Sequence, residues 1–171
     1  MADAVHAAGA PKPVGRYPHA RRVGELLFLS GIGPRDPATD AVPGNVHDAA
    51  GRLVAHDIAA QARAVFANVR AVLESAGARW EDLVDVTVYL TDLAGDFAAY
   101  NAAWAEAFPD PATAPCRTTL GIAALPTPIA IELKCIAHVG TSAAAGRPSS
   151  PLARPAGEGG TAADAGGGAR A

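Results

Sequence analysis

The pattern that most constrains the fold lies between Ile58 and Leu73, where apolar side chains recur every three or four residues. These side chains are Ile58, Ala62, Val65, Phe66, Val69, Val72 and Leu73. Asp57 can cap the start of the segment, and Gly77 can end it. The spacing predicts an amphipathic helix whose apolar stripe must pack against a second layer of structure.

That second layer is predicted to be a sheet, because strand patterns flank the helix. Residues 25–30 form a short apolar run that ends before Gly31, and a long loop is expected over residues 34–51. Residues 83–90 alternate and are rich in β-branched side chains, which predicts a strand. The alternation places Val84, Val86, Val88 and Leu90 on one face.

Aromatic residues mark a second helix, and two strands are expected to follow it. Phe97, Tyr100, Trp104 and Phe108 are three or four residues apart, and prolines 109 and 111 end the segment. The late strands are predicted over residues 117–125 and 129–139, joined by a turn at residues 126–128. In the last strand Ile129, Ile131, Leu133 and Cys135 share one face, whereas Glu132 and Lys134 take the other.

The order of these elements predicts the fold class. Strands, a helix, a strand, a helix and two strands indicate an α+β sandwich, in which both helices pack on one face of a mixed sheet. The opposite sheet face is left without cover. We expect an oligomer to bury that face and to form clefts between subunits.

Composition separates the folded unit from the chain ends. Residues 141–171 are mostly Ala, Gly, Pro and Ser, so burial cannot offset the entropy of ordering them, and a disordered tail is expected. Residues 1–13 look similar and are expected to be flexible. The sequence therefore predicts one folded domain over residues 14–140.

Charge and cysteine content exclude several function classes. The formal net charge of -3 gives no broad basic field for nucleic acid or an anionic membrane. Cys116 and Cys135 are too few for a disulfide framework and match no zinc pattern. Neither a signal peptide nor a run of about 18 apolar residues is present, so a cytoplasmic location is expected.

Several short motifs are better explained as structure than as cofactor sites. The pair Gly31 and Gly33 lacks the third glycine and the helix start of a dinucleotide loop. The acids at 36–40 and the pairs at 47–48 and 56–57 are typical of loops and caps, so no metal is predicted.

The late block APCRTTLGIAALPTPIAIELKCIAHV carries a Pro-x-Arg, an apolar strand, a Leu-Pro turn and a strand with Ile-Glu. Together with Gly-Arg-Tyr at 15–17, Ser-Gly at 30–31 and Tyr-Asn at 100–101, this block resembles the reactive intermediate deaminase (RidA, also YjgF) family. The resemblance covers nearly all of the predicted folded unit.

The resemblance implies a chorismate-mutase-like subunit, a homotrimer with sites between subunits, and cofactor-free attack of water on imines of 2-oxo acids. It leaves open whether trimers pair into hexamers. When the family's residues are matched by position, the resemblance implies that Arg117 binds a substrate carboxylate and that Glu132 orients the water. The pocket residues are Tyr17, Ser30 and Asn101, and Thr119 stands where many members carry Cys, so cysteine chemistry is not implied.

The opening Pro-Val-Gly-Arg-Tyr-Pro-His-x-x-Arg at residues 13–22 is similar to a narrower branch, the 2-aminomuconate deaminases. That branch implies loss of ammonia from 2-aminomuconate, giving 2-oxohex-3-enedioate in aromatic-compound catabolism. Such a substrate carries two carboxylates, so a second cation is required. His19 and Arg35 are the main candidates, and Arg16 and Arg63 are weaker ones.

The residue types suit imine hydrolysis, although each has a structural alternative. The guanidinium of Arg117 can bind a carboxylate through two parallel hydrogen bonds, but it could also form a strand-end ion pair. Glu132 could act as a base, or it could form a salt bridge with Lys134 or with a neighbour's arginine. Tyr17 could simply pack, Ser30 could end a strand, and Asn101 could bond within its helix.

Two other functions remain open at this stage. One is a general deaminase of 2-iminopropanoate and 2-aminoacrylate, which would use the same Arg117 and Glu132. The other is a ligand-binding or chaperone-like trimer without enzymatic activity, since a fold does not fix a function.

Overall fold

The structure is a computed structural model that describes residues 3–140. Its strands are β1 (Asp3–Val5), β2 (Ala20–Val23), β3 (Leu26–Leu29), β4 (Val46–His47), β5 (Leu53–Ala55), β6 (Leu83–Leu90), β7 (Cys116–Gly121) and β8 (Ile131–His138). Its helices are α1 (Ile58–Ser75), the short 3-10 turn η1 (Trp80–Asp82) and α2 (Leu93–Ala107).

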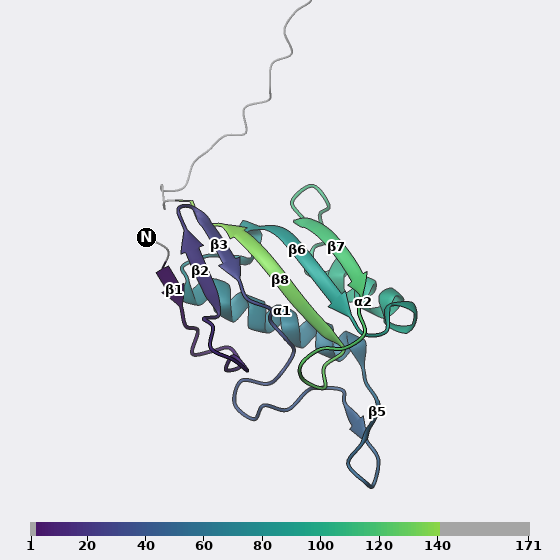
Figure 1. The fold of residues 1–171 in the computed structure, drawn as a ribbon. Coiled ribbons are helices and arrows are strands. Elements are labelled where there is room, and N and C mark those ends of the chain that lie inside the picture. The colour runs from purple at the N-terminus through teal and green to yellow at the C-terminus, as the bar shows by residue number, and fades with distance from the viewer. Residues whose placement is uncertain (1–2, 141–171) are drawn as a thin grey trace, which may run out of the picture.

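The main sheet has six strands in the order β1-β2-β3-β8-β6-β7. The β6–β7 pair is parallel and the other neighbours are antiparallel, so the sheet is mixed. Both helices lie on one face of this sheet (Figure 1). The α+β fold class predicted from the order of elements is confirmed.

Helix α1 forms as its sequence predicts. The Asp57 side chain accepts a hydrogen bond from the N–H of Ala60 at 3.0 Å, and Gly77 follows the helix with a φ of 73°. The apolar stripe is buried against the inner sheet face, which includes Leu133 and Cys135. This contact between helix and sheet forms the centre of the core.

The structure differs from the strand predictions at the start of β6 and by the presence of β2. The alternation placed Val84 with Val86 on the buried face, but Val84 is 43% exposed and Leu83 is buried instead. The pairing register of β6 with β8 shifts between Leu83 and Asp85, as in a β-bulge, and this shift moves Val84 to the other face. Strand β2, which pairs with β3 through the tight turn at Gly24, was not predicted, since its arginines hide any alternation.

The predicted element bounds change in two further places. Helix α2 begins at Leu93, four residues before Phe97, because Asp92 caps it by accepting from the N–H of Gly95. The predicted loop over 34–51 contains β4, which pairs with β5 in a separate two-stranded sheet. This hairpin projects from the body of the molecule (Figure 1).

The N-terminal segment is not the flexible arm predicted from its composition. Strand β1 pairs with β2, and Ala7 and Ala10 are buried in the core cluster. The ring of His19 joins this segment to the sheet, since its Nδ1 accepts from the N–H of Ala7 and its Nε2 lies 3.0 Å from the carbonyl oxygen of Pro11. The folded unit therefore begins well before residue 14, whereas the tail predicted over residues 141–171 lies outside the described residues.

Replacing His19 with alanine is expected to lower the melting temperature by several degrees. The change leaves the buried N–H of Ala7 without its acceptor, which costs about 1–3 kcal/mol. Thermal unfolding followed by circular dichroism measures the effect, and His47→Ala on exposed β4 is the control. Equal melting temperatures for His19→Ala and the wild type would contradict the anchoring role.

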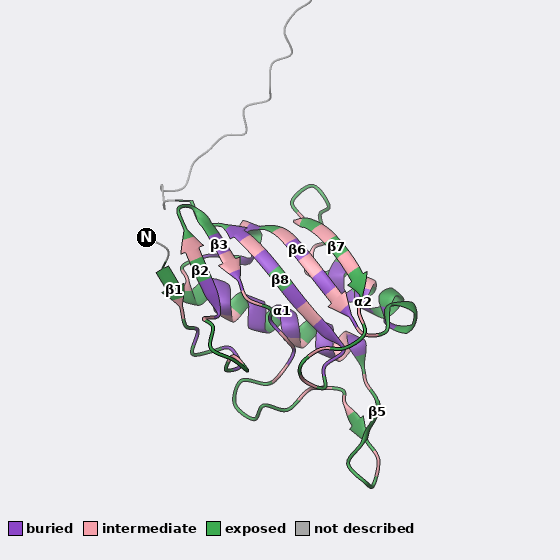
Figure 2. Cartoon of the chain, viewed as in Figure 1, coloured by how far each residue is buried: buried purple, intermediate pink, exposed green. Residues whose placement is uncertain are grey.

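The sheet face opposite the helices is uncovered in the single chain (Figure 2). It carries Phe28, Glu132, Lys134 and Ile136, together with the exposed Leu120 of the edge strand β7. The face thus carries both apolar and charged side chains. The oligomer that is expected to cover it stays a prediction. Between residues 3 and 140, no helix has the length and apolarity needed to cross a membrane.

Candidate active site

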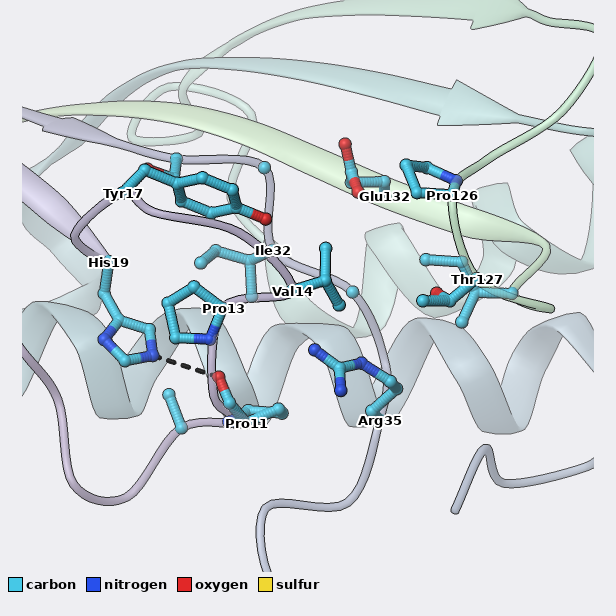
Figure 3. A pocket seen from close by; sticks show the side chains of 15 residues that line it. Pro11, Pro13, Val14, Tyr17, His19, Ile32, Arg35, Pro126, Thr127 and Glu132 are labelled. Carbon is cyan, nitrogen blue, oxygen red and sulfur yellow. Dashed lines mark hydrogen bonds between the residues drawn. The ribbon is translucent and has the colours of Figure 1, made fainter. Parts of the chain in front are cut away.

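A cavity of about 140 Å³ opens where the N-terminal segment meets β3 and β8. Its walls include Tyr17, His19, Ser30, Arg35 and Glu132, which come from separate parts of the chain and which the sequence had all marked as site residues (Figure 3). Sites for drug-sized ligands have volumes of roughly 300–1,000 Å³, and this cavity is smaller. It therefore suits a ligand smaller than a typical drug molecule.

Glu132 is the acid of this cavity, and it forms no salt bridge with any residue between 3 and 140. It lies in β8 on the uncovered face, where burial raises the pKa of its carboxyl above the usual range. The predicted alternative, a salt bridge to Lys134, is not formed, because the Lys134 ammonium donates to the carbonyl oxygen of Leu29 at 2.8 Å. Glu132 thus has the properties of a base that can hold a water molecule.

Gly31 makes room for the Glu132 carboxylate. A Cβ atom at position 31 would lie 2.3 Å from Oε1 of Glu132, which is far inside van der Waals contact. The sequence marked this glycine only through the Ser-Gly pair. The structure shows that the carboxylate occupies the space that a side chain at position 31 would need.

Replacing Gly31 with alanine is expected to lower kcat by about 100-fold, because displacing a catalytic group by about 1 Å has effects of that order. The clash is with the end of a flexible side chain, so the melting temperature is expected to change little. Steady-state kinetics and thermal unfolding test both statements. Gly9→Ala is the control, since a Cβ there meets only Ala71 at 3.6 Å. Full activity in Gly31→Ala would argue against a fixed carboxylate.

Tyr17 and Ser30 lie on the same cavity wall. The ring of Tyr17 is 43% exposed, and its hydroxyl is turned toward the side of the cavity where Glu132 lies (Figure 3). The hydroxyl of Ser30 donates to the carbonyl oxygen of Pro18 at 2.6 Å, which leaves its lone pairs able to accept from a ligand. Both residues line the cavity, and their contact with a substrate stays a prediction.

His19 is not available as the second cation. Because Nδ1 accepts from the N–H of Ala7, the proton is on Nε2, which donates to Pro11. Protonation of Nδ1 would break the bond to Ala7. The ring lines the cavity as a neutral structural group, which corrects the role expected from its position in the sequence.

Arg35 lines the cavity, but its guanidinium already has hydrogen-bond partners within the protein. Its Nη1 pairs with Asp40, and its Nη2 donates to the carbonyl oxygen of Lys12 at 2.7 Å. The side chain is only 14% exposed, so it is held in place. The weaker candidates Arg16 and Arg63 do not line the cavity.

The structure does not bring Arg117 to Glu132. Arg117 pairs in register with Val86, which pairs with Cys135, so its side chain lies on the helix face of the sheet, whereas Glu132 lies on the other face. The predicted strand-end ion pair is absent too, because no acid lies within salt-bridge distance of Arg117 in the described part of the chain.

The other two predicted pocket residues do not line the cavity. Thr119 lies with Arg117 on the helix face of β7, and its hydroxyl oxygen is buried. Asn101 is half-buried on α2. The structure therefore gathers five of the candidate residues around the cavity of Glu132, whereas Arg117, Thr119 and Asn101 lie outside it.

The acid and histidine motifs have structural roles in the described residues. Asp36 accepts from Thr39 and Ala38 in its loop, and His56 pairs with Asp96 at 2.8 Å. Among residues 3–140, no group of three or more His, Cys, Asp or Glu side chains is arranged to hold a metal ion.

A model of the protein family described as Endoribonuclease L-PSP matches residues 7–139. This chain belongs to that family, which contains the RidA and YjgF proteins. The match begins at residue 7 and so includes Ala7 and Ala10, which the structure buries in the core, but not strand β1.

Two relatives and one solved structure show how similar other family members are. A 2-iminobutanoate/2-iminopropanoate deaminase of Salmonella typhimurium is 36% identical over 138 residues, covering 80% of this chain and 98% of the relative. A RutC family protein of Pyrococcus abyssi is 40% identical over 129 residues, covering 75% and 91%. The crystal structure of the Escherichia coli YjgF gene product superposes with a TM-score of 0.68 at 34% identity, covering 80% and 98%.

Proposed function

We propose that this family member is a cofactor-free hydrolase that releases ammonia from an imine or enamine carboxylic acid. The observation that carries the proposal is the half-buried Glu132 carboxylate, which faces a small cavity and forms no salt bridge in the part of the chain that the structure describes. Arg117, a guanidinium without an acidic partner in the described chain, supplies the complementary charge for a substrate carboxylate.

The reaction needs both residues, so the proposal includes assembly. Arg117 lies on β7, the edge strand of the sheet, and the uncovered face next to it carries Glu132. A neighbouring subunit packed on this edge could place its own Arg117 opposite Glu132. We therefore propose a homotrimer with the active sites between subunits, and the sedimentation velocity of the purified protein tests its size.

The proposed chemistry uses water as the only co-substrate. Glu132 accepts a proton from water as the oxygen attacks the carbon of the C=N bond, forming a carbinolamine. Glu132 returns this proton to nitrogen, which gives a neutral carbinolamine. Glu132 then takes the hydroxyl proton of the carbinolamine and passes it to nitrogen, so that the C–N bond breaks and the nitrogen leaves as ammonia while C=O forms. An enamine first becomes an imine by gaining a proton at carbon and losing one from nitrogen. Tyr17 and Ser30, which line the cavity, are proposed to contact the substrate.

The proposed substrate is 2-aminomuconate, a dicarboxylate. Arg117 is expected to hold one carboxylate, and Arg35, which lines the cavity with Glu132, is expected to hold the other. Because the two nitrogens Nη1 and Nη2 of Arg35 already have partners, the second carboxylate would replace Asp40 or use the remaining Nε.

A second candidate is a general deaminase of small 2-imino acids such as 2-iminopropanoate. The engaged state of Arg35 favours this candidate, because a monocarboxylate needs no second cation. The name of the Salmonella relative supports it as well.

The test is ammonia release from 2-aminomuconate and from 2-iminopropanoate, each generated enzymatically, with the wild type and Arg35→Ala. The dicarboxylate hypothesis expects faster turnover of 2-aminomuconate and a KM that rises in Arg35→Ala for this substrate alone. Turnover of only 2-iminopropanoate would support the second candidate. Release of no ammonia from either substrate would favour a binding protein without enzymatic activity. RNA is tested as a further substrate because the family description names an endoribonuclease.

A further inference from the structure

Three polar side-chain atoms are buried between α2 and β7, and none of them has a hydrogen-bond partner among residues 3–140. They are the hydroxyl oxygen of Tyr100, Nη1 of Arg117 and Oγ1 of Thr119. Tyr100 has no exposed surface, whereas Arg117 and Thr119 are partly buried. Such a cluster is unfavourable unless its members satisfy one another.

Aromatic rings hold the Arg117 guanidinium against the helix. Its central carbon lies 4.8 Å from the ring centroid of Trp104 and 5.6 Å from that of Tyr100. Both distances are within the roughly 6 Å range of cation–π attraction. The orientation of the guanidinium is thus set from α2 and not by an acid.

The three atoms have complementary hydrogen-bonding capacity. Arg117 can only donate, the Tyr100 hydroxyl can accept and donate, and Thr119 can accept. Burial raises the pKa of Tyr100 to about 12, although the Arg117 charge and contacts with Thr119 oppose that rise. The hydroxyl therefore keeps its proton, and a small adjustment completes a chain from Arg117 through Tyr100 to Thr119.

We propose that Tyr100 and Thr119 are positioning residues that hold Nη1 of Arg117 in the core, so that the Nε and Nη2 edge is left to bind a carboxylate side-on. This inference rests on the proposed role of Arg117 in substrate binding. It also changes the role of Thr119, which was predicted to contact the substrate and here acts through the arginine.

Tyr100→Phe removes the hydroxyl and keeps the ring over Arg117. The expected result is a KM about tenfold higher with kcat almost unchanged, because orientation of the carboxylate is lost equally in the ground and transition states. Thr119→Val is expected to change KM in the same direction by a smaller factor. Thr118→Val, one residue earlier on the exposed face of β7, is the matched control.

Binding to 2-oxobutanoate and to its uncharged amide separates positioning from a general structural role. Calorimetry is expected to show about tenfold weaker binding of 2-oxobutanoate to Tyr100→Phe and equal binding of the amide to both proteins. Equal loss for both ligands, no loss for either, or no binding of 2-oxobutanoate to the wild type would overturn the inference. Melting temperatures identify a variant that fails to fold, in which case Thr119→Val decides.

The binding arm also separates this inference from the proposed function. Suppose that the wild type releases no ammonia from any imine, but that Tyr100→Phe binds 2-oxobutanoate more weakly than the wild type does. This result would support the positioning role of Tyr100 and reject the proposed deaminase activity. In an Arg117→Ala background, Tyr100→Phe is expected to have no further effect on 2-oxobutanoate binding. An additional loss there would show that Tyr100 acts independently of Arg117.

Discussion

Arg117→Ala is expected to lower kcat/KM for imine hydrolysis by about 100- to 10,000-fold. Two charge-assisted hydrogen bonds to a carboxylate contribute about 1.5–3 kcal/mol each, and about 1.4 kcal/mol corresponds to a factor of ten. The side chain makes no ion pair within residues 3–140, so the stability that the variant loses is expected to be limited to the cation–π contacts with Trp104 and Tyr100, and we expect it to fold.

Two further variants test whether the activity loss is specific to the guanidinium of Arg117. Arg117→Lys keeps the charge and loses the planar fork, so we expect most of the activity loss to remain. Arg79→Ala removes an exposed arginine that pairs with Asp82 far from the cavity, and it serves as the control. Ammonia release at several substrate concentrations measures the effect, and wild-type turnover by Arg117→Ala would remove Arg117 from the mechanism.

Glu132→Gln is expected to lower kcat by about 100- to 10,000-fold, the range typical of a lost general base. Because burial raises the pKa of Glu132, the wild-type rate should fall with decreasing pH earlier than it would for an exposed glutamate. Glu74→Gln on the exposed surface of α1 is the matched control and should leave the pH profile unchanged.

The same substitution at Glu132 is expected to stabilise the protein at neutral pH. A carboxyl whose pKa is raised in the folded state binds its proton more tightly there than in the unfolded chain. Its contribution to stability is full below the unfolded pKa and is lost as pH rises through the folded pKa. Melting temperatures of Glu132→Gln and the wild type should therefore differ at neutral pH and converge in acid.

A more stable wild type at neutral pH would contradict this expectation. It would indicate that a cation faces Glu132 in the assembled protein before substrate binds. Because no cation within residues 3–140 forms a salt bridge with Glu132, the measurement also tests whether the Arg117 of a neighbouring subunit approaches the carboxylate in the free enzyme.

Glu132 shows how far local pattern carries a site prediction. The alternation of β8 placed Glu132 opposite Leu133 and Cys135, and the structure confirms this face. The absence of a salt bridge to Lys134 and the close approach of Gly31 were not readable from the sequence. Both depend on how β3 lies beside β8, which pairs residues more than 100 positions apart.

His19 and the N-terminal segment show the opposite case. A three-residue strand is too short for a periodic signal, and the small residues around Ala7 resemble a flexible linker in composition. Their order comes from pairing with β2 and from the two bonds of the His19 ring. No local rule assigns a neutral structural role to a histidine beside a predicted pocket.

The sequence by itself determined the features that depend on local geometry. These are helix α1 with its caps, the alternation of β8, and the overall α+β class. Backbone periodicity and capping act over a few residues, so the amino acids there are sufficient. The tertiary structure alone decided that β6 lies between β7 and β8, and that Arg117 and Glu132 occupy opposite faces of one sheet. Strand order and register depend on long-range pairing and on the burial of whole faces, which no short segment encodes.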